Sequence, residues 1–385
     1  MSTLEQYIAA ITHLWKKQVR QKINNNDHPR DTVVGLIKNA KLQEFRVSRE
    51  NFEDRGEGTL ADGYSSLDQV AKVVQFYLNG QRNHGENLRD ALAFLFAHYF
   101  LLRGESIRKA ELTDFQTINL DNESVNADIK CPALVMVLRQ GKTNKNNRME
   151  LAGCMRNTRV EICPIMAMGL YFFWRFHVEN EPFPSFEKSE DWYQIKVFKT
   201  SDTDPTKTWS YTGHRDAINK GLVGAHIFTK KKTHINRGSS ARMADLAGVN
   251  EDQIRRLGRW NNTTMNGAYL TGLPREVMRV MAGFTVQQGQ FYLSRSAIDP
   301  PEELCRTIFP ELDAWNDRLM AKQMNEGTSG DPMQVTVAAK AFFQLLFMLR
   351  ITIVQDSVFM MDKFPNHPLW QNAIFSNPLF LEYKQ

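Results

Sequence analysis

The stretch "KKTHINRGSSARMADLAGVNEDQIRRLGRWNNTTMNGAYLTGLP", residues 231–274, combines two predicted helices with a distinctive set of polar and aromatic side chains. Thr233 is a suitable N-cap for the first helix, and Gly248 is a suitable residue to end it. His234 and Arg237 lie three residues apart on this helix, so they share one face with Cβ atoms about 5–6 Å apart. "NEDQIRRLG" predicts the second helix, which Trp260 closely follows.

Single features of this stretch carry little information about function. With nine histidines in the chain, chance alone produces roughly 0.6 histidine–x–x–arginine pairs. Trp260, and Tyr269 nine residues further on, are each explained equally well as packed aromatic side chains. The order of several such features along the chain is more informative.

Two upstream segments add basic residues to this order. "NLRDALAFLFAHYFLL", residues 87–102, is apolar all round, which predicts a buried core helix, and Arg103 follows it directly. "ALVMVLRQGKTNKNNRMELAG", residues 133–153, predicts a β-hairpin with Lys142 in its turn. The chain therefore presents, in sequence, an arginine, a lysine, histidine–x–x–arginine, a tryptophan and a tyrosine.

This order resembles the active site of the tyrosine recombinase/integrase superfamily, including the nine-residue step from the tryptophan to the tyrosine. "LLRGES", "GKTN", "GRWNNTTM", "AYLTGLP", "MAGF" and "IFPELDAWNDRL" are similar to its fungal branch. That branch contains the Crypton-type recombinases and the DNA-binding subunit of the budding-yeast centromere-binding kinetochore complex. The resemblance covers roughly residues 60–385 and implies a nuclear protein whose partner is double-stranded DNA.

The resemblance implies a role for each residue of the set. The implied catalytic residues are Arg103, Lys142, His234, Arg237, Trp260 and Tyr269. Arg103 and Arg237 correspond to the pair that clamps the non-bridging phosphate oxygens, a task that suits the planar guanidinium fork. His234 corresponds to the group that handles the tyrosine proton or bonds the phosphate, and Trp260 to an N–H donor to the same phosphate. Lys142 corresponds to the acid that protonates the leaving oxygen, and Tyr269 to the nucleophile.

Two positions depart from the pattern of the superfamily. Gly238 stands where a second histidine is usual after the arginine, and Ser106 stands where a carboxylate is usual, with Glu105 one residue early. A glycine within a helix either permits close approach of another backbone or breaks the helix. Both departures affect catalytic turnover more than binding.

The basic residues occur in separate clusters, as a groove lined with phosphates requires. The net charge is only +5, so the same clusters are also compatible with solvated helix faces. The predicted DNA contacts are Arg108, Lys109, Arg139, Lys145, Arg148, Lys230, Lys231, Lys232, Arg255, Arg256 and Arg259. No metal site or cofactor is predicted.

Composition indicates a folded protein, since 42% of its 385 residues are hydrophobic and 24% are charged. The four cysteines form no CxxC pair, which favours a reducing compartment. The longest apolar run, residues 342–349, is short for a membrane span, so no membrane partner is expected.

We expect a mainly α fold with a small β-hairpin or sheet, arranged as a tyrosine-recombinase-like domain with a small N-terminal helical domain. The predicted domains are a partial, core-binding-like helical domain (residues 1–58), a recombinase-like domain (62–300) and a helical C-terminal extension that packs on it (301–385). Apolar residues at helical spacing in residues 4–15 predict a buried stripe in the first domain. A homodimer or higher oligomer, and protein partners bound through the C-terminal region, are compatible with this organisation.

Three functions are compatible with the sequence. The first is a centromere-type DNA-binding protein in which Tyr269 no longer reacts. The second is an active Crypton-like recombinase that forms a 3′-phosphotyrosyl intermediate. The third is a protein-interaction scaffold without DNA contact, against which the basic clusters argue.

The first two functions are separated by a trapping experiment. If the chain cleaves DNA, a nicked duplex that contains its target site will trap a covalent protein–DNA adduct, and Tyr269→Phe will abolish that adduct, because the phenolic oxygen is the attacking atom. Denaturing gel electrophoresis measures the adduct. Its absence with wild-type protein on its proper target contradicts the recombinase alternative.

Overall fold

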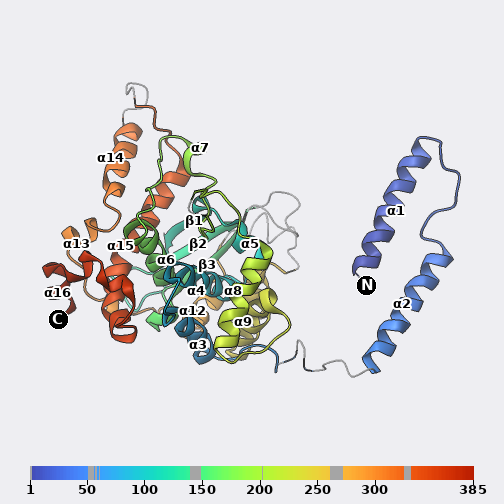
Figure 1. Ribbon diagram of the computed structural model, residues 1–385, viewed down its shortest axis with the longest axis horizontal. Helices are drawn as coiled ribbons and strands as arrows, with labels where there is room; N and C mark the ends of the chain where they lie inside the picture. Colours follow the sequence, from blue (N-terminus) through green and yellow to red (C-terminus); the bar gives the residue numbers. More distant parts are fainter. Residues whose placement is uncertain are drawn as a thin grey trace. The chain divides into compact units, whose positions relative to one another are not determined.

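The computed structural model divides the chain into two compact units, Met1–Thr59 and Leu60–Gln385 (Figure 1). It describes residues 2–50, 56, 59, 61–138, 149–201, 203–260, 272–324 and 331–385.

The first unit contains two helices, α1 (Ser2–Arg20) and α2 (Thr32–Glu50). Glu5 and Lys38 join them through a 2.6 Å ion pair, and Ile8 is buried. The predicted α1 helix is confirmed, but the predicted buried stripe is wrong for three of its members. Tyr7, Ile11 and Leu14 are more than half exposed, because two helices cover only one narrow face of each other.

The second unit is mainly helical with one small sheet, which confirms the predicted fold class. Its larger elements are α3 (Leu67–Leu78), α4 (His84–Tyr99), α5 (Gly104–Lys109), β1 (Phe115–Asn119), β2 (Pro132–Leu138), β3 (Glu150–Met155), α6 (Pro164–Phe173), α7 (Ser189–Trp192), α8 (Tyr211–Gly224), α9 (Ile235–Leu246), α10 (Glu251–Gly258), α12 (Arg275–Met281), α13 (Glu302–Arg306), α14 (Glu311–Met324), α15 (Val337–Lys363) and α16 (Pro378–Lys384). Short 3-10 turns and one π-helical turn, η3 (Trp174–Val178), connect them; η4 (Lys232–His234) leads directly into α9.

The sheet is antiparallel in the order β1-β2-β3, with Leu138 opposite Glu150 at the end of the β2–β3 pair. This pairing confirms the predicted hairpin. Successive side chains of β2 point to opposite faces. Leu134 and Met136 join the main core, whereas Ala133 and Val135 join a second core that includes Met278 of α12.

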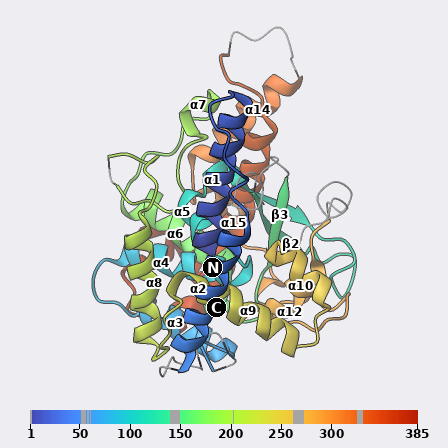
Figure 2. The same cartoon turned by 90° about the vertical axis from the view of Figure 1, so that its right-hand side faces the viewer.

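Helix α4 is the central element of the main core. Figure 2 shows it near α6 and α8, on the side away from α10 and α12. Every residue from Asn87 to Tyr99 is buried, as the prediction of a buried core helix requires, and α3, α6, α8 and α9 pack around it. The helix α15 packs on α6 and β1. This helix of 27 residues extends beyond the apolar run 342–349, and by length and composition it could cross a membrane. More than half of its most apolar segment is buried within the protein, however, and core helices pass the same test. Residues 301–385 thus lie in the same compact unit as the sheet.

A glycine allows the close contact between α6 and α15. A Cβ added to Gly169 would lie 2.8 Å from Cγ1 of Ile353. We expect Gly169→Ala to lower the free energy of unfolding by about 1–3 kcal/mol, because the two helices must separate to admit the methyl group. Urea denaturation measures this change.

Gly238→Ala in α9 is the matched control. Among the described residues, its added Cβ would meet no atom closer than Nη1 of Arg242, at 3.6 Å. The higher helix propensity of alanine should therefore raise the free energy of unfolding by up to about 1 kcal/mol. Equal destabilisation by both substitutions would contradict the packing argument.

Candidate nucleic-acid interface

Helix α9 is held against α4 by buried polar contacts. The Asn236 side chain donates to the carbonyl of Phe94 at 3.1 Å, and the Ser240 hydroxyl lies 2.6 Å from Nδ1 of His98. Burial lowers the pKa of His98 to about 3, so this imidazole is neutral and acts as a structural group. These contacts determine where the neighbouring Arg237 side chain lies.

The C-terminal end of α4 accepts two arginine side chains. Arg237 donates through Nη1 to the carbonyl of Leu101, and Arg259 donates through Nη2 to the carbonyls of Phe100, at 3.1 Å, and Leu101, at 2.9 Å. Leu101 has φ +48°, a left-handed conformation that turns the chain after the helix. Carbonyl groups at the negative end of a helix dipole are favourable partners for cations.

The C-terminal end of α10 completes the same cluster. Nη2 of Arg237 also donates to the carbonyl of Gly258 at 2.6 Å, and its guanidinium carbon lies 4.6 Å from the centre of the Trp260 ring. Gly258 lacks a side chain where a Cβ would overlap the Trp260 ring. Arg259 follows in a left-handed conformation with φ +55°, a position that usually takes glycine. The arginine at this strained position suggests that its side chain has a function.

Burial and neighbouring arginines disfavour the positive charge of Arg237 and of Arg259. Burial, followed by repulsion from Arg103, lowers the pKa of Arg237 to about 10. Burial, followed by repulsion from Arg237, lowers the pKa of Arg259 to about 9, with Glu150 at the start of β3 opposing the shift. Neither Arg237 nor Arg259 forms an ion pair with a carboxylate among the described residues, and Nη1 of Arg259 is buried without a hydrogen-bond partner there. We call Arg103, Arg237 and Arg259 the arginine cluster.

The other predicted site residues that the structure describes differ in burial and in contacts. Arg103 is half-buried and immediately precedes α5, and Arg108 on α5 lies over the ring of Tyr211, with its guanidinium carbon 5.3 Å from the ring centre. His234 is exposed and occupies the N-cap of α9, where the sequence predicted Thr233. Thr233 is instead buried within the preceding 3-10 turn. His234 and Arg237 therefore do not share one exposed face, because Arg237 points into the protein.

Several predicted DNA contacts are already paired within the protein. Lys109 pairs with Glu105 at 2.7 Å, a hydrogen bond that lowers the pKa of the Glu105 carboxyl group. Arg255 pairs with Glu251 at 2.7 Å. Arg256 donates to the carbonyl of Gly272. Exposed pairs of this kind contribute little to stability and can exchange partners. The residues Lys230 and Lys231 are exposed and Lys232 is half-buried in the segment that leads into α9.

Part of the predicted site lies outside the described residues. This part comprises Arg139, Lys142, Lys145, Arg148 and Tyr269. Helix α9 continues through Gly238, so this glycine does not break it. The sequence predicted Arg259 as a surface DNA contact. Its burial and its bonds to the end of α4 were missed, because no local pattern indicates which carbonyl groups a distant helix offers.

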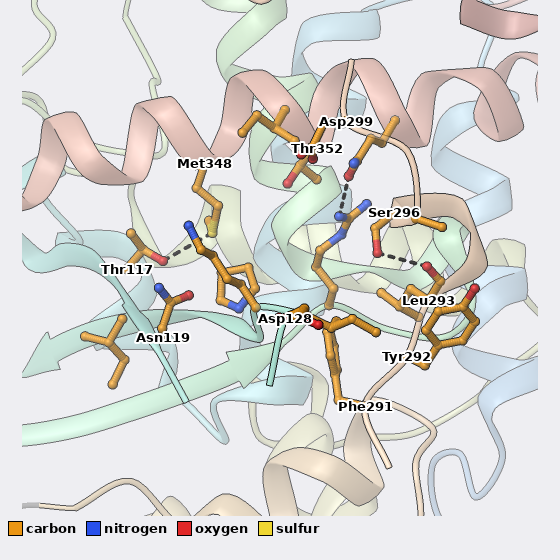
Figure 3. Close-up of a pocket in the computed structure, with 18 of the residues that line it drawn as sticks. Thr117, Asn119, Asp128, Phe291, Tyr292, Leu293, Ser296, Asp299, Met348 and Thr352 are labelled. Atoms are coloured by element: carbon orange, nitrogen blue, oxygen red, sulfur yellow. Dashed lines mark hydrogen bonds between the residues drawn. The ribbon is translucent and has the colours of Figure 1, made fainter. Parts of the chain in front are cut away.

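A separate pocket of about 800 Å³ lies between the sheet and α15 (Figure 3). None of the predicted site residues that the structure describes lines it. Its lining includes both signs of charge, with Asp128, Asp299 and Lys130. Arg156 also lines the pocket; it is buried and donates to Asp356 at 2.5 Å and to Gln355 at 2.7 Å. This pocket therefore lacks the net positive lining that a phosphate backbone requires.

The fold and the site together define a mainly helical protein in which the ends of two helices gather Arg237 and Arg259, neither of which has a carboxylate ion-pair partner in the described part of the chain. The chain belongs to the family of the centromere DNA-binding protein complex CBF3 subunit, domain 2, whose sequence model matches residues 20–381. A comparison with curated protein sequences gives no significant match.

Three solved structures illustrate the structural similarity. The structure of Ndc10, a platform for inner kinetochore assembly in budding yeast, is 14% identical with a TM-score of 0.46, over 83% of this chain and 67% of that chain. The Flpe–Holliday junction complex is 13% identical with a TM-score of 0.45, over 88% and 73%. The XerH site-specific recombinase bound to its palindromic difH substrate is 11% identical with a TM-score of 0.38, over 55% of this chain and about half (51%) of that chain.

The arginine cluster should bind an anion. We expect inorganic phosphate to raise the melting temperature of the protein more than chloride does at equal ionic strength, because an anion that binds only the folded state stabilises it. Differential scanning fluorimetry measures the shift. Arg259→Gly should remove most of the difference, since it deletes one cation while glycine suits the φ of +55°.

Phosphate also stabilises proteins by general exclusion from their surface. Lys340→Gln, which removes an exposed cation of α15, controls for this effect and should respond as the wild type does. An equal response in Arg259→Gly would show that the cluster binds no anion.

Proposed function

We propose that the chain is a nuclear, centromere-type DNA-binding protein that holds the DNA backbone at the arginine cluster. The observation that carries this proposal is the burial of two guanidinium groups, those of Arg237 and Arg259, that form no ion pair with a carboxylate among the described residues. A phosphodiester supplies the missing negative charge. The family description, a centromere DNA-binding protein complex subunit, supports the same partner.

The geometry suits a phosphate better than an isolated carboxylate. Arg237 and Arg259 are fixed by helix-end carbonyls, so their charges are in place before the ligand arrives. The half-buried Arg103 and the half-buried indole of Trp260 provide donors nearer the surface. Arginine is favoured for such sites because its planar fork matches two phosphate oxygens.

Gly238 supports close approach of DNA to α9. It is exposed, and a Cβ there would meet no protein atom closer than 3.6 Å, so no neighbour in the described part of the chain requires a glycine. A residue without a side chain beside Arg237 leaves the helix backbone accessible to a ligand. Strand cleavage by Tyr269, oligomerisation and protein partners through residues 301–385 are further predictions that this proposal does not require.

The affinity of the protein for duplex DNA should fall steeply with salt concentration, because each neutralised phosphate releases counterions. Arg103→Gln should reduce the slope of log affinity against log salt by about 1, which corresponds to one lost phosphate contact. Fluorescence anisotropy with a labelled duplex over a series of salt concentrations measures both slopes.

Lys340→Gln is again the matched control, since it removes the same charge from α15. A wild-type affinity that does not depend on salt would overturn the proposed function. A normal salt slope in Arg103→Gln, with DNA binding intact, would show that the DNA contacts another face.

A further inference from the structure

A second concave, positively charged surface lies where α3 and α8 end. This pocket of about 760 Å³ is lined by the cationic side chains of Lys72, Arg82 and Lys220, by His226, and by five side-chain amides. Among the described residues, no carboxylate lines it. The nearby Asp90 is buried, pairs with Arg89 at 2.9 Å and also attracts Lys220, so the uncompensated charge of the lining comes from Lys72 and Arg82. We call this surface the α3–α8 pocket.

The walls of the α3–α8 pocket are held in place by contacts between the two helices. The Tyr77 hydroxyl of α3 donates to the carbonyl of Ala217 of α8 at 2.8 Å. Lys220 donates to the amide oxygen of Asn87 at 3.0 Å, which joins α8 to the start of α4. The pocket is therefore part of the folded body, and its cations do not have to be gathered by a ligand.

Helix α8 connects the α3–α8 pocket to the surroundings of the arginine cluster. Its first residue, Tyr211, lies under Arg108 of α5, which begins directly after Arg103. Its 14 residues span about 20 Å at 1.5 Å per residue. The pocket at the other end of α8 therefore lies about 20 Å from α5, a distance equal to the rise of about six base pairs at 3.4 Å each.

The chain that leaves α8 extends this basic surface toward α9. His226, Phe228 and Lys230 are exposed in alternation with buried residues, and Phe228 is 71% exposed. Lys231 and Lys232 then lead to His234 at the start of α9. Exposed cations beside an aromatic side chain are typical of surfaces that follow a nucleic-acid backbone.

We propose that the α3–α8 pocket binds a second segment of the DNA sugar–phosphate backbone, about 20 Å from the α5 side of the arginine cluster. This inference rests on the proposed function, because one duplex must reach both surfaces. A long polyanion fits the observations better than a phosphorylated peptide does, since cations continue from the pocket along the 226–232 segment toward α9. The amides supply uncharged donors to phosphate and sugar oxygens without reading a base sequence.

The test compares two double variants with the same loss of charge. Lys72→Gln/Arg82→Gln removes two exposed cations of the pocket, neither of which forms an ion pair with a described residue, so folding should be retained. Lys188→Gln/Lys340→Gln removes two exposed cations elsewhere. Melting temperatures of both variants confirm that they are folded before binding is measured.

We expect Lys72→Gln/Arg82→Gln to reduce the slope of log affinity against log salt by about 2, and the control pair to leave it unchanged. In hydroxyl-radical footprinting, the pocket variant should lose protection of a block of sugars different from the block lost in Arg103→Gln. A slope and footprint equal to those of the control pair would overturn the inference while the proposed function stands.

Two further outcomes keep the proposals distinct. Failure of the wild-type protein to bind duplex DNA at any salt concentration contradicts the proposed function itself, and this inference with it. Unchanged DNA binding by the pocket variant, together with lost binding of a labelled phosphoserine peptide that the wild type binds, would assign the pocket to a protein partner instead.

Discussion

The site depends on the two carbonyl groups at the C-terminal end of α4. Phe100 and Leu101 accept hydrogen bonds from Arg237 and Arg259, which come from α9 and from the residue after α10. These bonds join α4 to two neighbouring helices that follow it by more than 130 residues in sequence. They also partly offset the cost of burying two cations, because helix-end carbonyls carry partial negative charge. Without the buried helix α4 there would be no common point at which the arginines meet.

The carbonyl groups compensate the positive charge of Arg237 and Arg259 only in part. The pKa of each buried guanidinium lies below its ordinary value, which means that the folded protein disfavours the charged form. Two residues at the site, Leu101 and Arg259, also have left-handed backbone conformations although neither is glycine. Each conformation costs about 1–2 kcal/mol. Strain and uncompensated charge at one place are typical of a site that a ligand completes.

The sequence was sufficient to predict the elements of this site but not their connections. The apolar run before Arg103 predicted the buried helix, and the Gly/Asn/Lys-rich turn predicted the β2–β3 hairpin. The contact of Arg237 with Trp260 could not be predicted from spacing, because it requires Gly258 to leave room for the ring. The exposed position of His234 at the helix start was also missed, since a cap is decided by backbone angles that Thr233 and His234 could both adopt.

The arginine cluster and the α3–α8 pocket differ in how far their cations are buried. At the cluster, burial makes each charge costly, so a phosphate that arrives there relieves an unfavourable state of the free protein. In the pocket, Lys72 and Arg82 are exposed and solvated, so a phosphate gains only a screened attraction and the entropy of released counterions. A duplex that contacts both surfaces would thus be held mainly by the cluster, and salt would act most strongly on the pocket. Position on the DNA and overall affinity would then be controlled by different residues of one continuous basic surface.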